Sequence, residues 1–249
     1  MCSILANACS SYTQAIDNAP KEDREFVRDV YRKRAYANLT GKRFTNAIED
    51  TLASCFGDLI DSKAQYCAGK AAYELGLYEE SQEHFEKALE SSPRDSKYRK
   101  DLNRANGRIA EQQDGEYDFQ SMGESLNEQH IHLDHASFIR NTMIATTEHK
   151  GRGLFAARFI ERGSLVLCEK ALGFPSMSSG KSQTHSVLFN FNTNTRTQGT
   201  AQGALFMELV HKLYNNPMLT SRFFDLDSGN YIRSGKEGEL VDGVPIIDV

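Results

Sequence analysis

The sequence predicts an α+β protein: an amino-terminal array of α-helices, followed by a β-rich half that carries a helical insertion. Two observations support this prediction. Aligning the first half with itself gives a match at a shift of 34 residues, and each matching unit has apolar residues at helical spacing. After residue 141, short apolar runs alternate with glycine-containing turns, a pattern typical of β-strands.

The composition is that of a soluble globular protein, because 39% of the 249 residues are hydrophobic and 25% are charged. No run approaches the roughly 20 apolar residues of a membrane span, and the first residues lack the basic start of a secretory signal. The five cysteines are scattered and never spaced as CxxC, which favours reduced thiols over disulfides or zinc ligands. We therefore expect a cytoplasmic or nuclear protein without a membrane partner.

The helical array is predicted to span residues 1–112 and to contain two repeat units, 28–61 and 62–95. Each unit comprises two antiparallel helices, and a short Leu-Gly-Leu-Tyr turn separates those of the second unit. Small residues at matching places let the helices approach closely, while aromatic residues fill the gaps between units. The small residues are Ala35, Ala47, Gly69, Ala72 and Ala88, and the aromatic residues are Phe44, Tyr78 and Phe85.

Further helices are predicted on both sides of these units. Residues 10–20 match the second helix of an earlier unit, and residues 95–113 match a polar helix that caps the array. The alternative is an ordinary helical bundle whose periodicity is accidental. The positions of the turns, aromatic residues and prolines agree with the 34-residue period and favour the repeats.

This pattern resembles the tetratricopeptide repeat (TPR) in its period and in its alternation of small and large residues. The resemblance implies a concave groove that binds a protein or an extended peptide. Some members of that family grip a peptide's terminal carboxylate with lysines, asparagines and an arginine. Lys63 matches one of those positions, but Lys33 stands where asparagine is usual and Cys67 where arginine is usual. The carboxylate clamp is therefore incomplete.

Basic residues cluster in the array and could meet an acidic peptide or phosphate groups. One cluster consists of Arg24, Arg28, Arg32, Lys33 and Arg34, and the other of Lys97, Arg99, Lys100, Arg104 and Arg108. The alternative is a solvated helix face, on which these side chains pair with Asp29, Asp95 and Asp101. We favour the solvated face because aromatic residues do not alternate with the basic ones as they do in single-strand binders. A nucleic-acid partner is not expected.

Residues 113–135 are predicted to be a polar linker. The linker ends in HIHLDH, where His130, His132, Asp134 and His135 could bind zinc or copper. The alternative is a polar edge whose two apolar residues point inward. Because the spacing matches no metal-site motif, we assign no metal ligand.

The stretch GRGLFA, which begins at Gly151 and ends at Ala156, satisfies one form of the dinucleotide fingerprint. That fingerprint requires a helix after its last small residue, and too few residues precede Gly163 to form one. The flanks instead predict strands at residues 142–147, 154–160 and 164–172. A turn at residues 150–153 would then expose bare backbone, as glycine permits.

The same stretch resembles the opening of a SET domain, the fold of S-adenosylmethionine-dependent protein-lysine methyltransferases. In that family a strand–GxG–strand opening contributes backbone to the methionine end of the cofactor. The resemblance assigns cofactor binding to Lys150, Gly151, Arg152, Gly153 and Leu154. Helical repeats followed by this opening are similar to a fungal group of TPR–SET proteins related to the MYND–SET enzymes.

On this resemblance, residues 136–249 are the amino-terminal part of a SET domain, with a polar insertion at 178–203 and an amphipathic helix at 204–216. The later half of that domain supplies an Asn-His pair and a tyrosine near the transferred methyl group. This sequence has no Asn-His dipeptide and no tyrosine after Tyr231. We therefore assign no catalytic residue, and we interpret His211 as a surface or packing residue.

We expect a chain truncated inside the SET domain, inactive alone and acting as a peptide-binding module through its helical groove. S-adenosylmethionine would be the cofactor of complete relatives and would not bind this chain tightly. The alternative is an active protein-lysine methyltransferase whose completing segment is missing from this sequence. A partial domain would leave apolar residues without a covering layer, namely Leu154, Phe155, Leu165, Val166 and Leu167.

Overall fold

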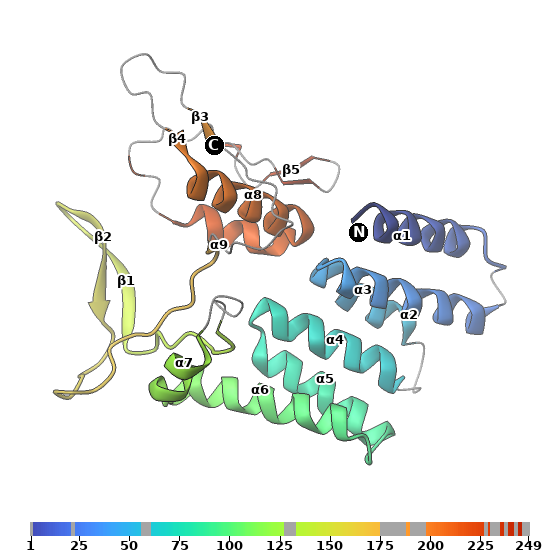
Figure 1. Cartoon of the computed structure of the whole chain (residues 1–249), viewed down its shortest axis with the longest axis horizontal. Helices are drawn as coiled ribbons and strands as arrows, with labels where there is room; N and C mark the ends of the chain where they lie inside the picture. The colour runs from blue at the N-terminus through green and yellow to red at the C-terminus, as the bar shows by residue number, and fades with distance from the viewer. Residues whose placement is uncertain are drawn as a thin grey trace. The chain divides into compact units, whose positions relative to one another are not determined.

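The computed structural model shows a mostly helical chain with short antiparallel strands (Figure 1). The structure describes residues 2–20, 23–55, 61–126, 133–174, 188–189, 198–226, 229, 235–236, 239–241 and 244–245. The helices are α1 (Cys2–Asp17), α2 (Arg24–Thr40), α3 (Phe44–Ser54), α4 (Ser62–Leu75), α5 (Tyr78–Ser91), α6 (Ser96–Asp114), α7 (Phe119–Ser125), α8 (Thr200–Asn215), the 3-10 turn η1 (Pro217–Leu219) and α9 (Thr220–Phe224). The strands are β1 (Thr142–Thr147), β2 (Gly151–Ala156), β3 (Leu188–Phe189), β4 (Gln198–Gly199), β5 (Leu240–Val241) and β6 (Val244–Pro245). None of these helices is long and apolar enough to cross a membrane.

The chain divides into two compact units. One unit combines Met1–Leu102 with Phe206–Val249, and the other is Asn103–Leu205. The first unit therefore joins helices from both ends of the sequence. The second contains the hairpin of β1 and β2, the largest antiparallel pairing in the part of the chain that the structure describes.

Consecutive helices of the first unit pack against one another, α1 on α2, α2 on α3, α3 on α4 and α4 on α5 (Figure 1). The two helices predicted within each 34-residue unit are present, as α2 with α3 and α4 with α5. Local chemistry fixes the ends of α4. The carboxylate of Asp61 accepts the backbone N–H groups of Lys63 and Ala64 at its start, and Gly76 ends it with a left-handed φ of 78°.

Close packing of α4 on α5 depends on small residues. An added Cβ at Gly69 would lie 2.6 Å from ring atoms of Phe85, which has no exposed surface. The hydroxyl of Ser81 donates a hydrogen bond of 2.8 Å to the carbonyl of Gly69, so the two helices also share a polar contact there. Ala68 and Ala72 are fully buried in the same helix. The helices can approach this closely because α4 has almost no side-chain volume on that side.

Two glycine substitutions should therefore change stability in opposite directions. Gly69→Ala should lower the free energy of unfolding by about 1–3 kcal/mol, because the new methyl group must displace a buried ring. Gly107→Ala, in α6, should raise it by up to about 1 kcal/mol, because nothing lies within 4 Å of the added carbon and alanine favours helix. Urea unfolding followed by circular dichroism measures both. Destabilisation of equal size in the two variants would contradict this account of the packing.

A partly buried polar network joins the first three helices. Arg34 in α2 binds the carboxylate of Asp50 in α3 with an N–O distance of 2.6 Å, and Asn38 donates to the other oxygen of that carboxylate at 2.9 Å. The guanidinium also donates to Thr13 in α1 at 2.9 Å. Since Asp50 is buried, removing one of these partners would leave a costly unpaired group.

Helix α8 and the turn after it pack against the α2–α3 and α4–α5 turns of the same unit. Leu213 and Leu219 form a buried cluster with Leu75. The cluster is surrounded by the partly buried residues Phe44, Ile48, Leu77 and Phe223. Burial of this apolar surface holds the carboxyl-terminal helices on the repeat array.

Asn216 makes the polar contact at this junction and is 2% exposed. Its side-chain oxygen accepts the backbone N–H of Phe44 at 2.8 Å, and its amide nitrogen donates to the carbonyl of Lys42 at 3.0 Å. Phe44 is the first residue of α3, whose own N-cap residue, Arg43, makes no side-chain capping bond. Asn216 therefore caps α3 from a position 172 residues away in the chain.

Replacing Asn216 with alanine should lower the free energy of unfolding by about 1–3 kcal/mol, because two backbone groups then lose their buried partner. The neighbouring Asn215→Ala is the control and should change stability by less than about 0.5 kcal/mol, since its side chain forms no hydrogen bond with the residues that the structure describes. Thermal and urea unfolding of both variants would test this. Equal stability of Asn216→Ala and the parent chain would show that the capping contact is unimportant.

Four segments differ from the prediction. Helix α1 begins near residue 2, whereas the pattern predicted a helix at 10–20, because the alanines before Ser10 continue the helical spacing. The predicted linker contains the short helix α7, which Asp118 caps by accepting the N–H of Ser121.

Residues 164–172, described in full, form no regular strand and make a single β-bridge, between Phe138 and Cys168. Helix α8 also begins at Thr200, before the predicted 204. Most of the predicted insertion, 178–203, lies outside the described residues.

Candidate functional site

The predicted cofactor-binding stretch lies in the antiparallel hairpin of β1 and β2. Strand β1 coincides with the predicted strand at 142–147, and Thr147 pairs with Gly151 at the closed end. The turn itself comprises residues 148–150 and precedes the GRG sequence. The predicted turn at 150–153 and the predicted strand at 154–160 were therefore wrong in position, because the turn begins at residue 148 and strand β2 spans Gly151–Ala156. The glycines belong to the first half of β2 instead.

Glycine is required at the first position of β2. Gly151 has a φ of 70°, a left-handed value that costs a residue with a side chain about 1–2 kcal/mol. Thr147 fixes the turn: its hydroxyl donates to the carbonyl of Gly151 at 2.9 Å and accepts the backbone N–H of Lys150 at 3.2 Å. The sequence signal that suggested a ligand-binding turn is thus also explained by hairpin geometry.

The five predicted cofactor-binding residues follow one another along this hairpin. Lys150, Gly151, Arg152 and Leu154 are exposed, whereas Gly153 is half-buried. An added Cβ at Gly153 would lie 3.0 Å from the ring of Phe155, so this glycine makes room for an aromatic neighbour. The five residues therefore offer mainly backbone groups and exposed side chains to a ligand.

Both faces of the hairpin carry exposed apolar pairs. Met143 lies opposite Phe155 and Ile144 lies opposite Leu154 in the strand register, and these pairs point to opposite faces. All four side chains are exposed, Ile144 and Leu154 to about 60% (62% and 58%). The prediction that Leu154 and Phe155 lack a covering layer is confirmed for the residues that the structure describes, as it is for Val166 and Leu167. Leu165, by contrast, is half-buried.

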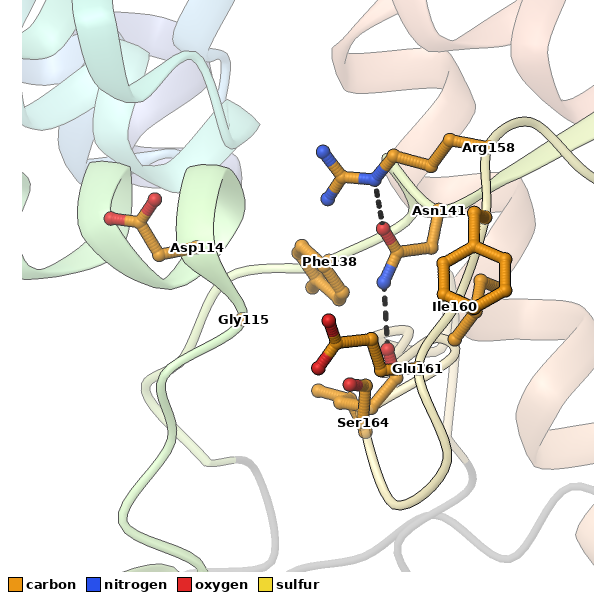
Figure 2. Close-up of a pocket in the computed structure, with 10 residues that line it drawn as sticks. Asp114, Gly115, Phe138, Asn141, Arg158, Ile160, Glu161 and Ser164 are labelled. Carbon is orange, nitrogen blue, oxygen red and sulfur yellow. Dashed lines mark hydrogen bonds between the residues drawn. The ribbon is translucent and has the colours of Figure 1, made fainter.

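An open depression of about 450 Å³ lies beside the hairpin within the second unit (Figure 2). It is lined by Asp114, Gly115, Phe138, Asn141, Arg158, Phe159, Ile160, Glu161, Ser164 and Leu165. None of these lining residues belongs to the predicted cofactor-binding set. The depression combines one guanidinium, two carboxylates and two aromatic rings, so its chemistry favours no single charge of ligand.

Asn141 organises this depression, and Figure 2 shows its side chain between Arg158 and the loop that carries Ser164. Its amide nitrogen donates to the carbonyl of Leu165 at 2.8 Å, and its side-chain oxygen accepts from Nε of Arg158. Its backbone carbonyl also accepts the N–H of Ala157 at 2.9 Å, immediately after β2 ends. One buried side chain thus connects the open end of the hairpin to the following loop.

The carboxyl-terminal half of α6 holds the segment that leads into the hairpin. Glu111 accepts the backbone N–H of Ala136 at 2.7 Å, and the hydroxyl of Tyr117 donates to the carbonyl of the same residue at 2.9 Å. Gly115, with a φ of 71°, leaves room for the buried ring of Phe138, which would lie 2.9 Å from an added Cβ. The predicted linker is therefore anchored at both of its described ends.

Only Asp134 and His135 of the histidine cluster lie in the described part of the chain. His130 and His132 lie outside the described residues. His135 contacts the carbonyl of Ala136 at 2.9 Å, and Asp134 accepts from Arg104 at 2.9 Å. No three potential metal ligands lie close together among the described side chains. His211 is exposed on α8.

A second candidate surface is formed by matching positions of α2, α4 and α6. We call it the repeat face. It consists of Asp29, Arg32, Lys33 and Tyr36 on α2, Lys63, Tyr66 and Lys70 on α4, and Lys97, Lys100 and Asp101 on α6, together with Asp61. The members on each helix are three or four residues apart and so share one side. Contacts between the helices, described next, show that these sides adjoin.

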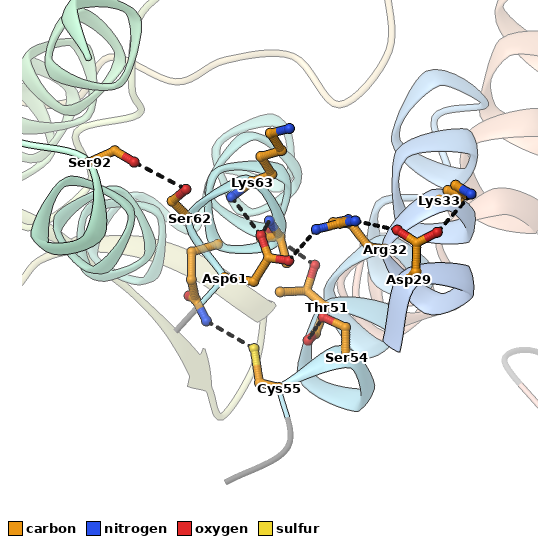
Figure 3. Close-up of polar contacts among 12 residues, drawn as sticks. Asp29, Arg32, Lys33, Thr51, Ser54, Cys55, Asp61, Ser62, Lys63 and Ser92 are labelled. Atoms are coloured by element: carbon orange, nitrogen blue, oxygen red, sulfur yellow. Dashed lines mark hydrogen bonds and ion pairs between the residues drawn. The ribbon is translucent and has the colours of Figure 1, made fainter. Parts of the chain in front are cut away.

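Arg32 connects α2 to α4 on this face (Figure 3). Its guanidinium binds Asp61, the N-cap of α4, at 2.7 Å and also binds Asp29. Lys33 binds the second oxygen of Asp29 at 2.7 Å. The hydrogen bond from Lys33, and then those from Arg32, hold the pKa of Asp29 below its usual value, so this carboxylate is charged and engaged.

Tyr66 connects α4 to α6. Its hydroxyl donates to Asp101 at 2.5 Å, its ring stacks on Tyr98 with centroids 4.5 Å apart, and Nζ of Lys97 lies 4.7 Å from its ring centroid. Burial, followed by the hydrogen bond to Asp101, raises the pKa of Tyr66, so the hydroxyl remains a donor. Lys70 approaches the same carboxylate at 3.6 Å.

The predicted solvated pairing of basic residues is confirmed for Arg32 and Lys33, which bind Asp29. Arg34 was grouped with them but points elsewhere, to the buried Asp50. Cys67, which stands where a clamp arginine is usual, is buried, and burial raises the pKa of its thiol to about 12. It offers no positive charge and no accessible group to a peptide carboxylate.

Comparison with known proteins yields one broad result. Over 243 residues, the chain is 28% identical to a protein named "Methyltransferase" from Gibberella zeae. The chain is distantly homologous to a fungal methyltransferase. The match covers 96% of this chain and 32% of the relative, so the chain spans about a third of that protein's length. No family model matches the sequence, and no solved structure matches it.

The predicted similarity to a fungal methyltransferase is confirmed at this broad level. Membership of the TPR–SET group stays a prediction. Sequence reasoning missed Asn141 and its partner Arg158, since a single asparagine before a strand carries no recognisable motif. It also missed the hydrogen bond from the backbone N–H of Ala136 to Glu111. The spacing of Arg108 and Glu111 predicts only the ion pair between these two side chains along one helix face.

Asn141→Ala should loosen the loop after β2. Loss of the bonds to Leu165 and Arg158 should speed amide hydrogen exchange across residues 158–165 by at least about fivefold, which corresponds to about 1 kcal/mol. Asn106→Ala, at an exposed position of α6 in the same unit, should leave exchange there unchanged. Mass-spectrometric hydrogen exchange measures both variants. Unchanged exchange in Asn141→Ala would show that the side chain of Asn141 does not stabilise the loop after β2.

Proposed function

We propose that this chain is the repeat-bearing part of a protein-lysine methyltransferase of the TPR–SET type and acts as its peptide-binding module. The observation that carries the proposal is the match to a methyltransferase over 96% of the chain. The division proposed with it is a repeat domain at 1–112, a linker at 113–135 and the first part of a SET domain at 136–249. S-adenosylmethionine would be the methyl donor in complete relatives.

The repeat array supports the peptide-binding part of the proposal. Helices α3 and α5 begin 34 residues apart, as do α4 and α6, and cross-helix contacts align one side of α2, α4 and α6 into a continuous face. Tyr36 is 68% exposed on this face, an unusual exposure for a large aromatic ring. Exposed aromatic residues between rows of charge are typical of surfaces that bind protein segments.

The hairpin supports the methyl-donor part to a more limited degree. Strand β2 pairs with β1 through one edge, and in the described residues no strand pairs with its other edge. Backbone N–H and C=O groups at that edge suit the amino and carboxylate groups at the methionine end of the donor. When bound, the donor supplies an activated methyl group. Lys150, Gly151, Arg152, Gly153 and Leu154 would hold one side of it through backbone contacts and so orient it.

The alternative is a complete methyltransferase activity that requires residues outside this chain. The match to about a third of the relative's length favours this alternative as an account of the longer protein. The two readings differ in what they require of this chain alone. The peptide-binding proposal assigns this chain peptide binding without methyl transfer. The alternative assigns it part of the catalytic centre of a longer protein.

The test is to incubate this chain and the Gibberella zeae relative separately with radiolabelled S-adenosylmethionine and a library of lysine-containing peptides. We expect the relative to form methyl-lysine and this chain to form none, because its exposed hairpin leaves a donor open to water. Peptide binding by this chain, measured on the same library by fluorescence anisotropy, should persist. Amino-acid analysis identifies the methylated residue.

Each outcome is informative. Methyl-lysine formation by this chain alone would establish catalysis within it and overturn the module-only reading. Methylation of a residue other than lysine by the relative would overturn the lysine assignment. Failure of this chain to bind any peptide would overturn the module itself.

A further inference from the structure

Basic residues outnumber acidic residues on the repeat face. Six of its members are basic, namely Arg32, Lys33, Lys63, Lys70, Lys97 and Lys100, and three are acidic, namely Asp29, Asp61 and Asp101. The whole chain carries a net charge of −5, so this face is positive within an acidic protein. A positive face on an acidic chain attracts anionic partners while the remaining surface repels them.

All three carboxylates of the face are already engaged. Asp29 binds Lys33 and Arg32, Asp61 binds Arg32 and caps α4, and Asp101 accepts from Tyr66 and lies near Lys70. These contacts fix the acidic groups between helices, so they are poorly placed to bind a basic ligand.

Several cations of the face, by contrast, have no carboxylate partner in the part of the chain that the structure describes. Lys63 and Lys100 are exposed, and neither forms an ion pair with the side chains that the structure describes. Figure 3 shows the ammonium group of Lys63 directed away from the Asp61 contacts. Lys97 lies over the ring of Tyr66. Unpaired ammonium groups are therefore distributed over both α4 and α6.

We propose that the repeat face binds an extended protein segment rich in aspartate and glutamate, with Lys63 and Lys100 as its main charge contacts. This inference rests on the proposed peptide-binding function and names the class of partner. The exposed ring of Tyr36 on the same face would contact the segment's apolar atoms. A basic segment, such as a lysine-rich methylation substrate, is predicted to avoid this face, so substrate and docking partner are different segments.

A peptide fits this charge pattern better than a nucleic acid does. Asp29, Asp61 and Asp101 stand among the cations on all three helices, so a continuous phosphate backbone would have to pass over fixed negative charges. Carboxylates of a peptide can instead alternate with other side chains and meet the lysines individually.

The experiment measures fluorescence anisotropy of labelled peptides of about ten residues, long enough to cross three helices packed roughly 10 Å apart. One peptide alternates glutamate with alanine, a second replaces each glutamate with glutamine, and a third replaces each with lysine. The glutamate peptide should bind at least about tenfold more tightly than the other two. Raising the salt from about 0.05 M to about 0.5 M should remove most of that difference, since exposed charges are screened.

Charge-reversal variants locate the binding face. Lys63→Glu and Lys100→Glu should each weaken binding of the glutamate peptide about threefold to tenfold, because each turns an attraction into a repulsion. Lys87→Glu is the matched control: it makes the same change at an exposed position of α5, which supplies no member of the repeat face. Lys87→Glu should alter affinity less than about twofold. Circular dichroism confirms that each variant is folded.

The outcomes separate this inference from the function on which it rests. Tighter binding of the glutamine or lysine peptide would overturn the acidic partner and retain the peptide-binding module. No binding of any peptide would overturn both. Equal losses in Lys87→Glu and Lys63→Glu would place the peptide elsewhere. Tighter binding of a single-stranded oligonucleotide, sensitive to the same lysines, would replace the acidic peptide with a nucleic acid.

Discussion

The close approach of helix backbones in the repeat array is the constraint on which the remaining structure depends. Where Gly69 meets Phe85, the space between α4 and α5 admits no additional carbon atom. Tyr66, three residues before Gly69 on α4, lies against the same ring with centroids 5.6 Å apart, and its hydroxyl reaches Asp101 on α6. The charged face is thus a result of core packing, since wider helix spacing would separate the partners of each contact.

The sequence predicted the regular part of this array well, because each helix pair carries its own apolar periodicity and its own turn residues. The hairpin was predicted correctly for β1, but the position of the turn was wrong. A glycine at residue 151 indicates a positive φ, but the sequence does not show whether that residue belongs to the turn or begins the strand. The predicted third strand failed because an apolar run identifies burial or pairing only when a neighbour is present, and residues 164–172 pair at one bridge.

The candidate site shows the limit of sequence reasoning more clearly. GxG predicted a ligand-binding backbone, and the geometry explains the same glycines by the turn and by the ring of Phe155. Asn141, which organises the adjoining depression, acts through partners 17 and 24 residues away. Such contacts depend on tertiary position. They leave no spacing pattern in a single sequence, whereas the ion pairs of helix faces do.

The contact of Asn216 with the α2–α3 turn has a consequence for synthesis on the ribosome. Its two ends are 172 residues apart, and translation at 5–20 residues per second separates their emergence by roughly 10–30 s. During that interval the amino end of α3 is uncapped and the apolar side chains around Leu75 lack Leu213 and Leu219. The nascent repeats must therefore stay folded, or be shielded by chaperones, until the last helices arrive.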